Sequence, residues 1–127
     1  MKVLIALVFS VLLVACNSET NNKKDAVKQG ELLFNKKHIG VNKVIGCVSC
    51  HSVKPDQVIV GPSLSGLSIR APHLVSGQTG KEYIKNSIIN PDSYVVGGYL
   101  PAVMFPHYAQ ELSNEEIDAL VEYLSLL

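Results

Sequence analysis

The chain has 127 residues, and its 11 Lys and Arg are matched by 11 Asp and Glu, so we expect one small domain with a formal net charge of zero. The lack of a basic surplus argues against nucleic acid as a partner, and the lack of an acidic surplus argues against a disordered acidic tail. There is no Trp and only 6% of the residues are aromatic. A core without its usual bulky side chains leaves room for a non-protein group.

The first 15 residues have the pattern of an export signal. Lys2 gives a positive start, and the apolar run over 3–14 is broken only by Ser10. This run is shorter than the roughly 20 residues that span a bilayer. Leu13-Val14-Ala15-Cys16 resembles the bacterial lipobox, which implies cleavage before Cys16 and a diacylglycerol on its thiol. We therefore expect a lipid-anchored protein on the periplasmic or outer face of a bacterial membrane; the alternative is a buried helix with an incidental cysteine.

The segment that follows the anchor is polar and contains no large apolar side chain. We expect residues 16–25 to form the lipidated cysteine and a flexible tether, and residues 26–127 to form the folded domain. The first helix of that domain is expected to begin near Asp25. Its buried face should carry Val27, Gly30, Leu33 and Phe34.

Two further helices begin with the pattern of a capping box. Thr79 and Glu82 open the first of them, which should end at Asn90-Pro91 because the residue before a proline disfavours helix. Ser113 and Glu116 open the last helix, expected over about residues 113–126. Its apolar stripe is formed by Ile117, Leu120, Val121 and Leu124.

The remaining stretches, 52–76 and 90–110, are rich in Pro, Gly and Ser and are predicted to be loops. The apolar run 58–60 could be a strand, although no partner strand is evident. A helical domain with such long loops needs a further reason to be ordered. A large buried ligand would provide that reason.

Cys47-Val48-Ser49-Cys50-His51 is a C-x-x-C-H motif, which is typical of covalent attachment of a c-type haem. Two thiols one helical turn apart can reach the two vinyl groups on one side of the porphyrin. The adjacent histidine can then present its imidazole to the iron. We expect one haem c, attached through Cys47 and Cys50 and ligated by His51.

Other uses of this cysteine pair fit the sequence less well. A disulfide across two intervening residues gains little loop entropy. A zinc site needs four ligands, and no second cysteine pair is present. A thioredoxin-like redox pair belongs to an α/β domain, whose parallel-sheet pattern is absent here. Export also favours haem, because c-type haem is attached outside the cytoplasm.

With this motif in place, residues 26–127 resemble the class I cytochromes c. Gly30 and Phe34 match the family's N-terminal helix, and Tyr123 matches its aromatic partner in the last helix. The resemblance implies an all-α fold in which these two helices cross, next to a covalently bound haem. A glycine inside a helix costs about 1 kcal/mol relative to alanine, so Gly30 needs a packing reason of this kind.

Residues 61–70 resemble the family segment that follows the haem motif. The resemblance implies that the carbonyl of Pro62 accepts a hydrogen bond from Nδ1 of His51, which orients the imidazole and strengthens it as a ligand. It also implies that Arg70, the only arginine of the chain, lies near a haem propionate. The alternative for Arg70 is a solvated loop residue.

The resemblance implies that Met104, in a proline-rich loop before the last helix, is the second iron ligand. In the family a proline follows this methionine directly, whereas here Phe105 intervenes. A lone methionine is otherwise a core filler, and His107 is the rival ligand. His38 and His73 are expected at the surface and not at the iron. Tyr94 and Tyr99 are expected either to hydrogen-bond a haem propionate or to pack on the haem edge.

Ligation by histidine and methionine would leave no open position for a substrate or for O₂, and a thioether raises the reduction potential. We therefore expect a one-electron carrier and not an enzyme, with redox proteins as partners and no small-molecule substrate. Residues 87–99 look like a segment of cytochrome domains in respiratory complexes, such as those fused to oxidase subunit II or the lipoprotein monohaem subunit of alternative complex III. A haem-based gas sensor remains the alternative if Met104 does not bind the iron.

Overall fold

The structure is a computed structural model that describes residues 20–127. The expected export signal, its cleavage site and the lipidated Cys16 lie outside the described residues. The described chain begins with an N-terminal helix over residues 20–34. The elements that follow are β1 (His38–Ile39), β2 (Val44–Ile45), η1 (Cys47–Ser49), α2 (Leu67–Arg70), η2 (Ala71–His73), α3 (Gly80–Ile89), η3 (Pro91–Ser93), α4 (Tyr108–Glu111) and α5 (Asn114–Leu124).

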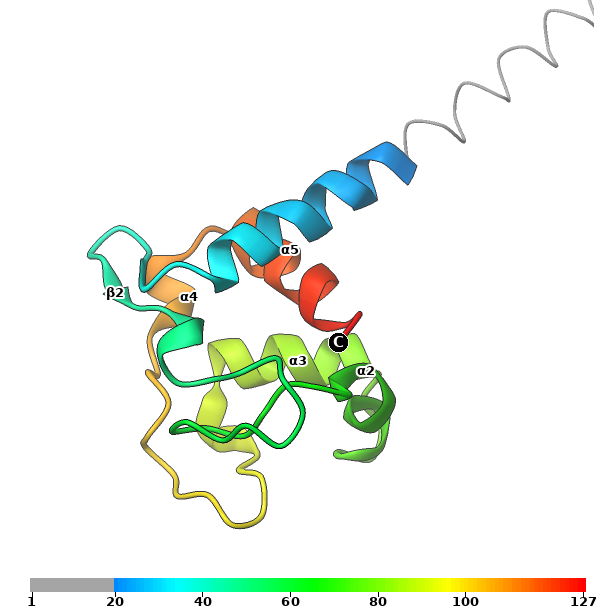
Figure 1. The fold of residues 1–127 in the computed structure, drawn as a ribbon, viewed down its shortest axis with the longest axis vertical. Helices are drawn as coiled ribbons and strands as arrows, with labels where there is room; N and C mark the ends of the chain where they lie inside the picture. The colour runs from blue at the N-terminus through cyan, green and yellow to red at the C-terminus, as the bar shows by residue number, and fades with distance from the viewer. Residues whose placement is uncertain (1–19) are drawn as a thin grey trace, which may run out of the picture.

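The N-terminal helix crosses α5, as expected (Figure 1). A Cβ atom built on Gly30 would lie 2.0 Å from the carbonyl oxygen of Ala119, so only glycine lets the two backbones approach this closely. Next to this crossing, the rings of Phe34 and Tyr123 pack with their centroids 5.7 Å apart. The predicted roles of Gly30, Phe34 and Tyr123 in the helix crossing are therefore confirmed.

One expectation about this helix is wrong. Residues 20–25 were expected to belong to a flexible tether, with the helix beginning near Asp25, but they are helical and exposed. The turns around Gly30 are stabilised by packing, and once a helix is present each further residue adds a hydrogen bond at little cost. No glycine or proline interrupts residues 20–25, so the helix extends beyond its packed part.

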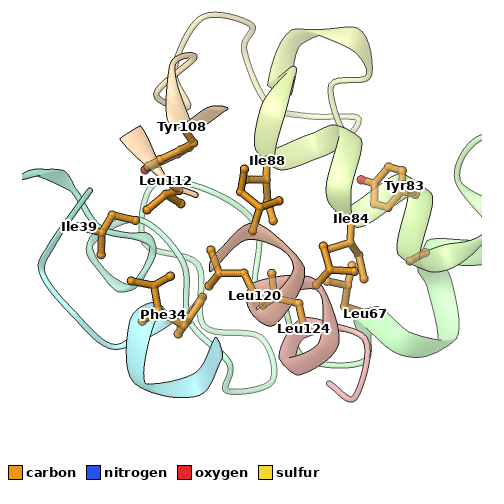
Figure 2. Close-up of a cluster of buried hydrophobic side chains, with 14 residues drawn as sticks. Phe34, Ile39, Leu67, Tyr83, Ile84, Ile88, Tyr108, Leu112, Leu120 and Leu124 are labelled. Atoms are coloured by element: carbon orange, nitrogen blue, oxygen red, sulfur yellow. The ribbon is translucent and has the colours of Figure 1, made fainter. Parts of the chain in front are cut away.

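Helices α3 and α5 pack against each other, and both begin with the predicted capping boxes. Thr79 caps α3 together with Glu82, and Ser113 caps α5 together with Glu116. Figure 2 shows Ile84 and Ile88 of α3 facing Leu120 and Leu124 of α5 in the core. Outside this apolar contact, ion pairs Lys81–Glu122 and Lys85–Asp118 join the same two helices.

The loops contain more structure than the sequence predicted. Two-residue strands β1 and β2 form a small antiparallel hairpin, which Glu111 of α4 holds by accepting hydrogen bonds from the backbone and side-chain amides of Asn42, each 2.9 Å long. Residues 58–60 form no strand. Within the described residues, no helix is long and apolar enough to cross a membrane.

Candidate cofactor site

A cavity of about 750 Å³ opens between the C-x-x-C-H segment, α3 and the long loop that precedes α4. Its size lies within the range of about 300–1,000 Å³ that is usual for ligand and cofactor sites. Among the residues that line it are all six cofactor-binding candidates of the folded domain: Cys47, Cys50, His51, Pro62, Arg70 and Met104. The fold thus gathers side chains from three separate segments around one space.

The two thiols stand at the two ends of η1, a single 3-10 turn at the wall of the cavity: Cys47 is its first residue and Cys50 caps its C-terminal end. The backbone N–H groups of Cys50 and His51 both donate to the carbonyl of Cys47, at 3.1 Å and 2.9 Å, which winds the motif into a turn. The two cysteines form no disulfide with each other. Burial raises the pKa of Cys47 to about 11, so this thiol is protonated at neutral pH in the chain without a cofactor.

The imidazole of His51 is fixed from one side. Its Nδ1 lies 2.9 Å from the carbonyl oxygen of Pro62, so the predicted contact is present. A carbonyl only accepts hydrogen bonds, which places the proton on Nδ1 and leaves Nε2 with a free lone pair. Burial lowers the pKa of His51 and outweighs the opposing effect of Pro62. The imidazole is therefore neutral at neutral pH, as a metal ligand must be.

Gly61 lies directly against the same imidazole. A Cβ atom at this position would lie 2.4 Å from Cε1 of His51 and 2.9 Å from its Nδ1. Gly61 was not among the site residues predicted from the sequence. Its signal was the Gly61-Pro62 pair itself, in which the glycine gives space and the proline gives the acceptor.

Arg70 lines the cavity, and two N–H groups of its guanidinium donate to backbone carbonyls. Its Nη1 donates to the carbonyl of Ser65 and its Nη2 to the carbonyl of Ser63. These contacts clamp the turn that follows Pro62. Arg70 lines the cavity, as expected, and two of its donors hold the backbone of residues 63–65; its contact with a haem propionate stays a prediction.

Met104 and His107, the two candidates for the second ligand, are separated by the fold. Met104 is half-buried and lines the cavity, whereas His107 is exposed at the start of α4 and does not line it. The ring of Phe105, between them in the sequence, packs on Tyr108 with centroids 5.0 Å apart. His38 and His73 are exposed, as expected.

Aromatic rings form much of the remaining wall. Tyr94 and Tyr99 both line the cavity, and Tyr94 packs edge-on against Tyr83 with centroids 5.7 Å apart. Tyr108 donates a 2.8 Å hydrogen bond to the carbonyl of Ile45, and burial raises its pKa. Tyr83 and Tyr108 were missed from the sequence, because an aromatic residue on a helix gives no sign of which neighbour it faces.

Charged side chains are scarce at the mouth of the cavity. The two segments 57–69 and 93–110 contain no Asp, Glu, Lys or Arg. From these segments Val60, Leu100 and Val103 line the cavity while remaining at least half exposed. We call these two segments the uncharged rim.

The residues present fit a haem. Two thiols, a neutral imidazole with its Nε2 free and a thioether line one large, mainly apolar space. A zinc site does not fit, because the described residues contain no group of three or more His, Cys, Asp or Glu side chains that could hold a metal.

A model of the cytochrome c family matches residues 27–127. The chain belongs to the cytochrome c family. The cytochrome is also 32% identical to cytochrome c2 iso-1 of Magnetospirillum fulvum over 90 residues, which cover 61% of this chain and 87% of that protein. No solved structure matches the chain at a significant level.

Family membership agrees with the predicted all-α fold and cofactor. The cytochrome carries haem c attached covalently through Cys47 and Cys50, next to His51. A bound haem supplies one-electron redox chemistry. The chain is accordingly an electron carrier and not an enzyme in its own right, and redox proteins are its expected partners.

Replacing Gly61 by alanine is expected to displace the imidazole of His51 and to break its contact with Pro62, because the new Cβ would overlap the ring. The haem should stay attached through the thioethers, while the NMR signals of the proximal histidine and the reduction potential change. Gly97→Ala is the control, since a Cβ there meets nothing within 4 Å. Unchanged histidine signals in the Gly61 variant would contradict this account of the site.

Proposed function

We propose that the protein is a lipid-anchored monohaem cytochrome c that passes single electrons in a respiratory chain, with His51 and Met104 as the axial ligands. The observation that carries this proposal is the placement of Met104 on the cavity that also contains His51, Cys47 and Cys50. His107, the rival ligand, does not line that cavity.

The proposed iron ligands suit a protein that relays electrons and not one that catalyses a reaction on a bound substrate. An imidazole on one side and a thioether on the other would occupy both axial positions and exclude exogenous ligands. Pro62 and Gly61 fix the imidazole, so little of the proximal side has to reorganise when the charge changes. Thioether ligation favours the reduced state and so raises the reduction potential.

Anchoring to a membrane rests on the sequence Leu13-Val14-Ala15-Cys16 behind its apolar run. Two acyl chains on Cys16 would hold the protein firmly at the surface, on the periplasmic or outer face. Because residues 20–25 are helical, only three residues, 17–19, separate Cys16 from the helix. This short separation favours a subunit docked in a quinol-oxidising or oxidase complex over a shuttle with a long reach.

The visible spectrum of the purified protein tests the assignment, after expression in a host that matures c-type haem. We expect a c-type spectrum when reduced, a weak far-red band from methionine–iron(III) ligation when oxidised, and no change on adding CO. Ready CO binding without the far-red band would instead favour the gas sensor. Failure to attach haem, with a control cytochrome matured in the same cells, would contradict both functions.

The anchor is tested separately by fractionating cells that express the native chain or Cys16→Ser. We expect the native protein in the membrane fraction and the variant outside it, with identical spectra, because Cys16 lies far in sequence from the haem motif. Equal partition of the two proteins would rule out lipid attachment at Cys16 without affecting the haem assignment.

A further inference from the structure

The loop that carries Met104 has few polar contacts of its own. Between residues 94 and 106 the backbone makes one backbone–backbone hydrogen bond, from the N–H of Tyr99 to the carbonyl of Val96, at 3.1 Å. This contact is internal to the loop and does not attach it to the rest of the domain. Something else must determine where the loop lies relative to the cavity.

On its C-terminal side the loop is held by apolar packing. The ring of Phe105, which follows Met104, lies against Tyr108 of α4, and both Met104 and Phe105 pack on the buried core. Apolar packing is non-directional, so it holds Met104 near the cavity without fixing its depth or direction.

On the N-terminal side of Met104 the loop is held by a directional contact. Oδ1 of Asp92 accepts a hydrogen bond of 2.8 Å from the backbone N–H of Ala102, two residues before Met104. Asp92 belongs to η3, which is tied to the end of α3 by a hydrogen bond from Ser93 N–H to the carbonyl of Asn90 and by another from Asn86 Nδ2 to Ser93 Oγ, both 3.0 Å. The carboxylate therefore stands on a rigid support.

The hydrogen bond to Asp92 is donated by a residue with a strained backbone, Ala102. Ala102 has a φ of +58°, in the left-handed region that costs a non-glycine residue roughly 1–2 kcal/mol. The preceding Pro101 has no N–H to contribute a hydrogen bond. A turn of this kind persists where its surroundings hold it in place, and the bond from Ala102 N–H to Asp92 supplies that hold.

We propose that Asp92 is a positioning residue for Met104. Its carboxylate fixes the turn at Pro101-Ala102, and this turn sets the thioether at the cavity and keeps exogenous ligands from taking its place. The inference rests on the proposed function, because it takes Met104 as the iron ligand.

Imidazole is a suitable probe, since it competes with a methionine ligand on the oxidised protein and its binding removes the far-red band. We expect Asp92→Ala to bind imidazole about fivefold more tightly than the native protein, because a hydrogen bond to a charged acceptor has been lost at an exposed site. Asp92→Asn keeps an acceptor oxygen and should lie close to the native value.

Glu82→Ala is the matched control. Glu82 is also an exposed carboxylate that accepts from a backbone N–H, that of Thr79 at 2.7 Å, but at the opposite end of α3 from Asp92. Its variant should bind imidazole as the native protein does. An equal effect of Glu82→Ala and Asp92→Ala would mean that general loss of stability, not positioning, explains the result, and would overturn the proposal.

Amide hydrogen exchange supplies a second readout. Exchange at Ala102 should accelerate in Asp92→Ala and remain near native in Asp92→Asn. Native imidazole affinity in Asp92→Ala would overturn the proposal, as would an equal change in Asp92→Asn, which would indicate an effect of charge. A native protein without the far-red band would refute Met104 ligation itself, and the native spectrum alone distinguishes that failure from the others.

Discussion

Replacing Met104 by alanine is expected to remove the far-red band, to let CO bind the reduced protein and to lower the reduction potential by on the order of 100 mV. Met104 is the thioether that lines the cavity shared with His51. In the proposed ligation, its loss would leave the iron with His51 as its one protein ligand and would remove the sulfur that favours the reduced state. Potentiometric titration together with CO difference spectra measures all three effects.

His107→Ala is the matched control for this experiment. His107 lies three positions beyond Met104 on the same loop but is exposed and does not line the cavity. This variant should keep the native band, the native potential and the resistance to CO. The reverse pattern, with His107→Ala altered and Met104→Ala native, would move the second ligand to His107.

The second large effect is expected at the helix crossing, where Gly30→Ala should destabilise the fold by about 3 kcal/mol. The added Cβ would lie 2.0 Å from the carbonyl oxygen of Ala119 and 2.8 Å from Cβ of Tyr123, so one backbone must move. For a domain of about 100 residues, each kcal/mol lowers Tm by roughly 4–8 °C. Thermal unfolding of the haem-loaded protein, followed by circular dichroism, measures the change.

Gly97→Ala again serves as the control, because a Cβ there has open space. This variant should keep the native Tm to within about 2 °C. A native Tm for Gly30→Ala as well would mean that the two helices can separate slightly without loss, and would refute the close crossing as a determinant of stability.

Local signals in the sequence predicted the main helices well. The capping boxes at Thr79 and Ser113 act within one turn, so their residues suffice to mark where α3 and α5 begin. Gly30 was informative for a different reason, since a glycine inside a helix is unfavourable unless another backbone approaches it.

The elements that were missed depend on partners distant in the sequence. The hairpin of β1 and β2 is held by Glu111, which lies far along the chain from Asn42, and strands of two residues carry no periodicity to detect. Short α2 and α4 lie in stretches that were predicted to be loops, because a single turn cannot be distinguished by pattern. The extension of the N-terminal helix over residues 20–25 was missed because polar composition alone suggested a tether.

The residues of the candidate site also fall into two groups, those expected from the sequence and those found only in the structure. The C-x-x-C-H motif is a contiguous sequence pattern, whereas the contact of Pro62 with His51 and the position of Met104 at the site were implied by the resemblance to the class I cytochromes c. The side chains that hold those groups in place, such as Gly61 behind the imidazole and Asp92 behind Ala102, become evident only once the chain is folded. Arg70 lines the cavity as the resemblance implied, and its contact with a haem propionate stays a prediction; its bonds to the carbonyls of Ser63 and Ser65 became evident only in the structure.

The uncharged rim, residues 57–69 and 93–110, has a consequence for how a redox partner meets this protein. The rim exposes apolar side chains and no charged ones, among them Val60, Leu100 and Val103. Added salt therefore has little electrostatic attraction between this face and a partner to screen. Encounter through this face would be driven by the release of water from apolar surface, with a negative change in heat capacity. Electron exchange through this face would then run at nearly the same rate in dilute buffer and in concentrated salt.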